Sequence, residues 1–230
     1  MLILSARKRT VVAVAIAVAL MAAFVAVVSA SAAERASVPP GPIVVIDPGH
    51  GGRDGGVVSA DGIKESDVNL AISRGLRAYL TDAGYTVVMT RDSDVDLAEG
   101  TSDGYKRADM LARRRIIEDA RPDLVISIHQ NSYGSPGVRG AQVFYAPGSE
   151  EGKAYADRVQ SVLSASLGTD RVAKEGDYYI LQCTSYPSLL VECGFLTDPT
   201  EAALLATDEY RMRVAYVLSV AVRELMEAPV

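Results

Sequence analysis

The two histidines of the chain offer its clearest chemistry. His50 closes the run IVVIDPGH and His129 closes LVISIH, so each lies within a few residues of the end of a predicted strand. Imidazole is the commonest protein ligand for metals, and parallel strands deliver the residues at their carboxyl ends to one edge of a sheet. A lone histidine more often makes a structural hydrogen bond. Two histidines in equivalent places make a shared metal site as plausible as two separate structural roles.

A metal site needs a third ligand. Catalytic zinc takes about three protein ligands, commonly two imidazoles and a carboxylate, and keeps a position for water. Glu65 opens the predicted helix KESDVNLAI, close to the strand that ends at His50. Glu65 or Asp67 would equally complement the positive N-terminus of that helix, and spacing leaves both interpretations open.

Glu192 lies in LLVECGF, an otherwise apolar strand. A buried glutamate is costly unless it is paired, protonated or bound to metal, and burial raises its pKa toward the range of a general base or acid. A structural ion pair with Arg91 or Arg113 is the competing interpretation. Asp47 together with Glu192 would suit a retaining glycosidase.

The glycine-rich loop HGGRDGG begins at His50. It has neither the Gly-Lys-Ser/Thr ending nor the GxGxxG spacing of a phosphate-binding loop, and the chain has no GxSxG element of a serine hydrolase. Its glycines allow a sharp bend that aims the His50 imidazole. Arg53 and Asp54 are candidates for contacts to substrate or to the metal ligands.

Strands alternate with helices along the chain. The predicted strands are Ile43–Asp47, Tyr85–Thr90, Leu124–His129, Ala141–Tyr145 and Leu189–Cys193. The predicted helices cover Val68–Ala83, Tyr105–Ala120, Glu150–Leu167, a short segment after Asp198-Pro199, and Asp208–Met226, whereas Arg91–Asp103 is read as an exposed loop. This alternation predicts an α/β fold: a single domain with a twisted, mostly parallel sheet and helices on both faces.

The N-terminus differs from the rest of the chain. Three cations, Arg7 to Arg9, precede 18 apolar residues from Val11 to Val28, and a small-residue triplet follows. We predict a signal peptide or an N-terminal membrane anchor over residues 1–32, a linker over 33–42 and a catalytic domain over 43–230. The domain is then exported, either secreted or held at the outer face of the cytoplasmic membrane, with membrane contact only through this segment.

The net charge bears on the binding partners, and the two cysteines bear on disulfide bonding. The net charge of −6 becomes −9 without residues 1–32, which carry three cations and no acid, so nucleic acid is disfavoured. The two cysteines, Cys183 and Cys193, are expected to be free, partly buried thiols, because a separation of ten residues does not bring them into disulfide range by itself.

Five blocks of sequence resemble a known family in order and spacing. IVVIDPGHGGRDGG, KESDVNLAISRGL, TVVMTR, LVISIHQNS and PSLLVECGFLTDPTEAALL are similar to the zinc-dependent N-acetylmuramoyl-L-alanine amidases of the Amidase_3 type. The segments ISIHQNS, GAQVFY, YYIL and VECGFL further resemble the germination-specific, spore-cortex branch of that family.

The resemblance implies roles for individual residues. It places the Zn²⁺ ligands on His50, Glu65 and His129, the catalytic glutamate on Glu192, and a polar residue near the site on Asn131. Arg53, Arg91 and Arg139 are candidates for binding carboxylates on the stem peptide, the peptide that is joined to muramic acid. A surface position or a structural ion pair is an equally good interpretation of each.

The implied function is hydrolysis of the amide between N-acetylmuramic acid and L-alanine in peptidoglycan, and the germination-specific branch implies spore cortex modification as the setting. The alternatives are a metal-dependent deacetylase of cell-wall sugars and a non-catalytic wall-binding module. Neither a wall-binding repeat nor an inserted helix that would plug the cleft is recognisable in the sequence. The N-terminal segment or an accessory protein is therefore expected to hold the enzyme near its polymer.

Overall fold

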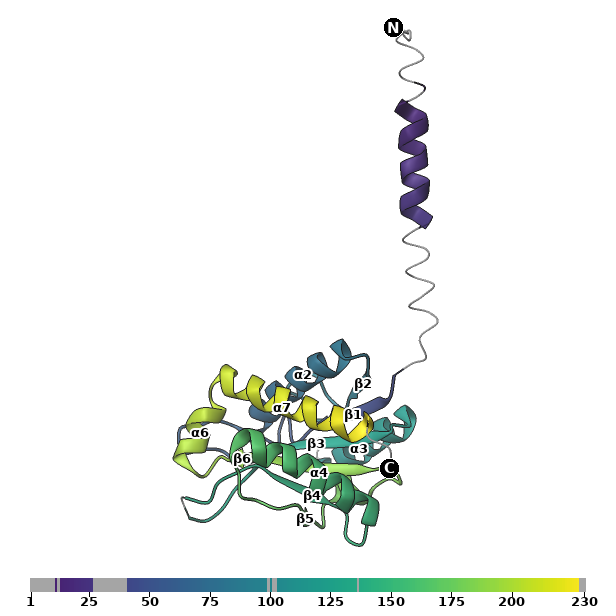
Figure 1. Ribbon diagram of the computed structural model, residues 1–230. Helices are drawn as coiled ribbons and strands as arrows, with labels where there is room; N and C mark the ends of the chain where they lie inside the picture. The colour runs from purple at the N-terminus through teal and green to yellow at the C-terminus, as the bar shows by residue number, and fades with distance from the viewer. Residues whose placement is uncertain are drawn as a thin grey trace. The chain divides into compact units, whose positions relative to one another are not determined.

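The computed structural model describes residues 11, 13–26, 41–98, 100, 103–135 and 137–227. The chain divides into two compact units, Met1–Pro40 and Gly41–Val230. In the first unit, residues 11 and 13–26 are helical and exposed (Figure 1). Of the helices in the described ranges, none combines the length and the apolar character that crossing a bilayer requires. The predicted roles of residues 1–42 stay predictions.

The second unit is built on one six-stranded sheet with the strand order β2-β1-β3-β6-β4-β5. The strands are β1 (Ile43–Pro48), β2 (Thr86–Met89), β3 (Leu124–Asn131), β4 (Gln142–Tyr145), β5 (Lys174–Glu175) and β6 (Ser188–Phe195). β1 pairs in parallel with β2 and β3, and β3 with β6, whereas β4 is antiparallel to β6. The predicted mostly parallel sheet is confirmed.

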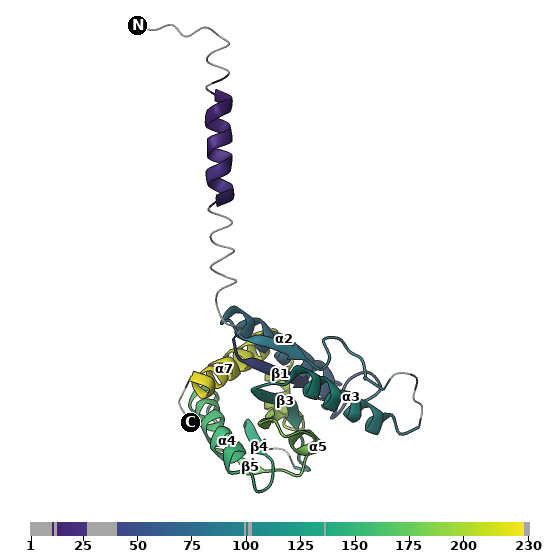
Figure 2. The same cartoon turned by 90° about the vertical axis from the view of Figure 1, so that its right-hand side faces the viewer.

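Helices cover both faces of this sheet, as Figure 2 shows. They are α2 (Glu65–Asp82), α3 (Tyr105–Ala120), α4 (Glu150–Leu167), α5 (Tyr179–Gln182), α6 (Pro199–Leu205) and α7 (Asp208–Glu227). The larger core cluster packs α2, α4 and α7 against one face, and a smaller cluster packs α3 and α5 against the other. Because both faces are covered, β1 and β6 are apolar along most of their lengths and buried.

The alternation of side chains along the strands decides which residues meet. In β6, Leu189 and Val191 belong to the larger core, whereas Leu190 belongs to the smaller one, so Glu192 points to the α3 and α5 face. His129 points the same way from β3, since Ile128 belongs to the larger core and Val125 to the smaller. His129 and Glu192 are also register partners on adjacent strands.

The local structure differs from the predictions in two respects. Residues 91–103 are not wholly exposed, because Arg91 and Ala98 are buried. The short elements β5 and α5 were not predicted, since two residues of strand and about one turn of helix are too short to show a period. By contrast, the predicted cap of α6 is present: the Asp198 carboxylate accepts hydrogen bonds from the backbone N–H groups of Thr200 and Glu201.

Both cysteines are free, as the sequence predicted. Cys193 packs in the larger core and Cys183 in the smaller one, so the two thiols lie on opposite faces of the sheet. The sheet itself therefore prevents a disulfide between them.

Candidate functional site

Three predicted ligands converge at the carboxyl ends of β1 and β3. Glu65 Oε1 lies 3.2 Å from His50 Nε2 and 3.0 Å from His129 Nδ1. The two imidazole rings meet edge to face with their centroids 5.1 Å apart. The two histidines thus face a common point, because parallel strands end at the same edge and the first turn of α2 lies directly above it.

The Glu65 carboxylate is buried, and both of its oxygens accept hydrogen bonds. Its Oε2 accepts a hydrogen bond from the Val57 backbone N–H (2.9 Å), and its Oε1 accepts one from the Gln130 backbone N–H (3.1 Å). Burial alone would raise the pKa of Glu65, but hydrogen bonds and charge from His129 and His50 outweigh it and hold the pKa well below its usual range. Glu65 is therefore an anion, the form that binds a metal.

His50 is placed by an unusual backbone. Its φ of +59° lies in the left-handed region, which residues other than glycine seldom adopt. Asp54 Oδ2 lies 3.2 Å from His50 Nδ1 and so directs Nε2 toward Glu65. Burial lowers the pKa of His50, but Glu65 and Asp54 together outweigh burial and raise it. Gly49 is required beside it, because a Cβ there would overlap the His129 ring.

Two buried arginines hold the turn that carries His50. Arg113 donates to the backbone carbonyls of Pro48 (2.8 Å) and His50 (2.7 Å). Arg91 donates to the carbonyls of Pro48 (2.9 Å) and Gly49 (2.9 Å). Consecutive carbonyls of a strained turn are thus satisfied by charged donors, which fixes the direction of the imidazole.

Glu192 lies beside this cluster in the middle of β6. It is 7% exposed, and its Oε2 has no hydrogen-bond partner within the described part of the chain. Burial raises its pKa to about 7; Glu65 adds to the rise, and the two histidines oppose it. The ion pair considered from the sequence does not form, because Arg91 and Arg113 are engaged elsewhere. Glu192 is therefore a carboxyl group able to exchange a proton near neutral pH.

The donor set fits zinc. His50, Glu65 and His129 each offer one ligand atom, and these atoms all lie within 4.8 Å of one another. Tetrahedral zinc with bonds of about 2.0–2.1 Å separates its ligand atoms by roughly 3.3 Å, close to the two separations measured from Glu65 Oε1. Two imidazoles with one carboxylate are also a common protein set for catalytic zinc with an open position.

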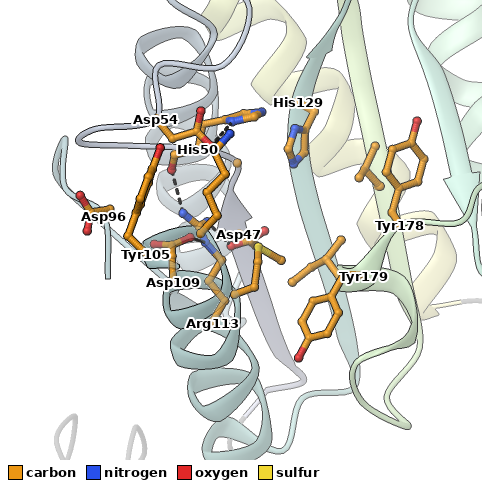
Figure 3. A pocket seen from close by; sticks show the side chains of 15 residues that line it. Asp47, His50, Asp54, Asp96, Tyr105, Asp109, Arg113, His129, Tyr178 and Tyr179 are labelled. Atoms are coloured by element: carbon orange, nitrogen blue, oxygen red, sulfur yellow. Dashed lines mark hydrogen bonds and ion pairs between the residues drawn. The ribbon is translucent and has the colours of Figure 1, made fainter. Parts of the chain in front are cut away.

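A cavity of about 180 Å³ opens next to the two imidazoles. Figure 3 shows His50 and residues of α3 on one side of it, and His129 with Tyr178 and Tyr179 on the other. Most of its exposed lining is apolar, including Ile180 and Leu190. It provides a recess for a bulky substrate group directly beside the cluster.

The predicted substrate residues are spread more widely. Asn131 follows His129 by two residues, and its side-chain Oδ1 accepts a hydrogen bond from the Ser132 N–H. Arg53 pairs with Asp96 (2.7 Å) and lies over the Tyr105 ring. Arg139 pairs with Asp198 (3.0 Å).

Arg91 does not fit the substrate-reading role suggested from the sequence. It is 3% exposed and also donates to the carbonyls of Ser66 and Ser93. Because four of the roughly five N–H donors of an arginine are then engaged, the structure favours a structural role. Sequence reasoning took Arg91 for a loop residue because the segment after it is polar.

Asn69, Gln130 and Tyr178 belong to the site but were not found from the sequence. Asn69 donates to Glu65 Oε1 (3.3 Å) and to the Gly49 carbonyl (3.1 Å), and Gln130 donates to Asn69 Oδ1. Burial, with a contribution from nearby Glu192, raises the pKa of Tyr178. The available signal for Asn69 was its position four residues after Glu65 on an apolar helix face.

The protein-family model for N-acetylmuramoyl-L-alanine amidase matches residues 44–224, which is nearly all of the second unit. The chain belongs to the N-acetylmuramoyl-L-alanine amidase family. The predicted family is thus confirmed, and with it the prediction that the chain is an enzyme of this kind.

Relatives of this amidase include one with a stated biological setting. The germination-specific N-acetylmuramoyl-L-alanine amidase of Bacillus subtilis (strain 168) is 40% identical over 180 residues, which is 76% of each chain. The CwlD amidase from Clostridioides difficile, solved in complex with the GerS lipoprotein, is 29% identical with a TM-score of 0.77 over 80% of this chain and 98% of that one. The catalytic domain of CwlV from Bacillus (Paenibacillus) polymyxa var. colistinus is 28% identical, with a TM-score of 0.72 over 82% of this chain and 99% of that one.

Proposed function

We propose that this amidase is zinc-dependent and hydrolyses the bond between N-acetylmuramic acid and L-alanine in the peptidoglycan of the spore cortex. The observation that carries the proposal is the convergence of His50, His129 and Glu65 Oε1 within about one metal coordination sphere, with Glu192 beside them. Similarity to a germination-specific amidase supports the cortex as the setting.

In this proposal His50, Glu65 and His129 hold the ion. A zinc ion bound there would supply positive charge that polarises the scissile carbonyl and makes nearby water more acidic. Glu192 accepts the water proton on its unpartnered Oε2 and later delivers it to the departing amine of L-alanine. A pKa near 7 suits both transfers, because the same group must take up a proton and release it.

Export and an accessory protein complete the proposal. The basic residues before the apolar N-terminal run support a catalytic unit outside the cytoplasmic membrane, either secreted or anchored. The solved CwlD amidase is bound to a lipoprotein. By analogy, we propose that a protein partner assists this chain on its insoluble substrate.

Metal analysis of the purified chain, paired with mass spectrometry of digested peptidoglycan, tests the proposal. We expect about one zinc per chain, release of free stem peptide, and loss of release on chelation that zinc restores. Acetate in place of peptide would identify a deacetylase of wall sugars. Binding to sacculi with neither zinc nor any product would identify a wall-binding module, and either result would overturn the proposed activity.

A further inference from the structure

A second hollow, a groove of about 920 Å³, lies on the β4 side of the site. Its lining includes Asn131, which follows His129 by two residues, and Gln142, the register partner of Glu192 across β4 and β6. The groove therefore begins next to the two residues that flank the proposed reaction centre. None of the roles assigned above to the metal cluster or to Glu192 accounts for it.

Arg171 lines this groove with its guanidinium held in place. Its Nε donates to the Arg139 backbone carbonyl (2.8 Å), and its guanidinium carbon lies 5.0 Å from the centroid of the Phe195 ring. The next residue is also fixed, because Gln142 Nε2 donates to the Val172 carbonyl (2.8 Å). The segment that carries Arg171 is thus tied to the strand directly opposite Glu192.

The other charges of the groove are already engaged or exposed to water. Arg139 pairs with Asp198 and donates to Thr200 Oγ1, and the Glu201 carboxylate accepts backbone N–H groups from Gly140 and Phe195. Asp170 also lines the groove and is exposed. Arg171 is half-buried and forms no ion pair with any described residue. It is the charge most available to a ligand.

The chemistry of the two hollows differs. The exposed lining of the smaller cavity is mostly apolar, although charged side chains such as Asp54 and Lys106 also line it. The exposed lining of the groove is more polar, with amides, hydroxyls and a guanidinium beside aromatic side chains such as Tyr133 and Phe195. The substrate of the proposed function has two unlike parts that meet at the scissile amide: a sugar, whose ring packs well on aromatic side chains, and a peptide with carboxylates. Because the peptide is the more polar part of the substrate and the groove has the more polar lining, we place the peptide in the groove.

We propose that the groove is a carboxylate-binding subsite and that Arg171 binds a carboxylate of the stem peptide beyond L-alanine. The planar fork of a guanidinium matches the two oxygens of a carboxylate, and its stacking on Phe195 holds that fork ready for the ligand. The identity of the peptide rests on the proposed function, whereas the affinity of the groove for a carboxylate does not.

A binding experiment without turnover tests the subsite directly. The ligands are N-acetylmuramoyl-L-alanyl-D-glutamate and its counterpart with both carboxylates converted to amides, titrated calorimetrically into the Glu192→Gln protein. We expect the acid to bind about tenfold more tightly than the amide. Adding Arg171→Gln removes most of that preference, and Arg171→Lys retains part of it because it keeps the charge but loses the fork. Arg158→Gln, which alters an exposed arginine of α4, is the matched control and leaves the preference unchanged.

Three binding results would overturn the subsite. They are equal binding of the acid and the amide, no binding of either, and a preference for the acid that survives Arg171→Gln in a folded protein.

Kinetics on the same two compounds separate this inference from the proposed function. Cleavage of both compounds with equal kcat/KM would leave the amidase activity standing and reject Arg171. Binding that depends on Arg171 without release of peptide would reject the amidase proposal and keep the subsite.

Discussion

The surroundings of two carboxylates in the site shift their pKa values in opposite directions. Glu65 is buried, but two imidazoles and two backbone N–H groups hold its pKa far below the usual range. Glu192 is also buried, its Oε2 has no hydrogen-bond partner in the described part of the chain, and its pKa is raised to about 7. Such a pair separates the roles of anion and proton carrier in one site.

Glu192→Gln is expected to abolish proton transfer while leaving the metal in place. The amide has nearly the same size as the acid but cannot accept the water proton, so kcat should fall about 10²–10⁴-fold. Zinc content should stay near that of the unaltered protein, because Glu192 is not in the ligand set. Turnover of a soluble muramoyl peptide and metal analysis measure both, with Glu224→Gln on the exposed side of α7 as the control. Near-normal turnover would exclude Glu192 as the proton carrier.

Asp47 predicts an acid-dependent loss of stability. Burial raises its pKa, but the Arg113 charge and hydrogen bonds from Thr90, Ser127 and Arg113 outweigh burial and lower the pKa to about 2. The folded pKa is thus below the unfolded value of 3.8, so this stabilisation is complete above pH ~4 and is lost as the pH falls toward 2. Its size is about 2 kcal/mol.

Urea unfolding between pH 5 and pH 2 measures this effect. The free energy of unfolding of the unaltered protein should fall by about 2 kcal/mol more over that range than that of Asp47→Asn, which has no carboxyl group to titrate at this position. Parallel pH profiles for the two proteins would show that Asp47 is not the responsible group.

At the scale of elements, the connection from β1 to α2 is the part that makes the site. Its backbone turns through a left-handed His50, and its carbonyls are bound by arginines from α3 and from the segment after β2. The helix α3 thereby acts as a brace: Arg113 also pairs with Asp47 and Asp109, both at 2.7 Å. A distant element therefore sets the direction of a metal ligand.

Arg113→Lys tests this brace. Lysine keeps the positive charge but cannot reach the carbonyls of Pro48 and His50 together with both acids, so we expect a loss of about 2–3 kcal/mol of stability. Because His50 is then less well directed, zinc affinity should fall about 10–100-fold. Chelator competition measures the affinity and urea unfolding the stability. The control is Arg114→Lys, the exposed neighbour that pairs with Glu118. Zinc affinity equal to that of the control would limit Arg113 to a stabilising role.

At the scale of the whole molecule, the catalytic unit carries its own core and its own site. The buried apolar clusters of the described chain lie within Gly41–Val230, as do the metal cluster, Glu192 and both hollows. Chain entry at Ile43 and the site after Pro48 lie at opposite ends of β1. The described residues that form the reaction site therefore all belong to this unit.

A protein that begins at Gly41 is expected to fold and work on soluble substrate. Its melting temperature should change by less than about 2 °C, since a loss of 1 kcal/mol would shift it by roughly 2–4 °C. Its kcat/KM on a soluble muramoyl peptide should equal that of the full chain, while localisation in cells would report on the predicted export role of residues 1–32. A large drop in melting temperature would show that residues before Gly41 stabilise the catalytic unit.

Residue type and periodicity determined much of this protein before any coordinates. Alternating apolar segments predicted the α/β sheet, because this signal is local. Histidines at two strand ends and an acid in an apolar strand pointed to a possible site, and the resemblance to the amidase family supplied the full set of ligands. Only the tertiary structure decided that β4 runs antiparallel to β6 and that His129 lies opposite Glu192. It also decided that Glu192 forms no ion pair with Arg91 or Arg113. It also buried Arg91 and brought Arg171 to the groove. Strand register and the pairing of distant charges depend on contacts between remote segments, which spacing along one chain does not encode.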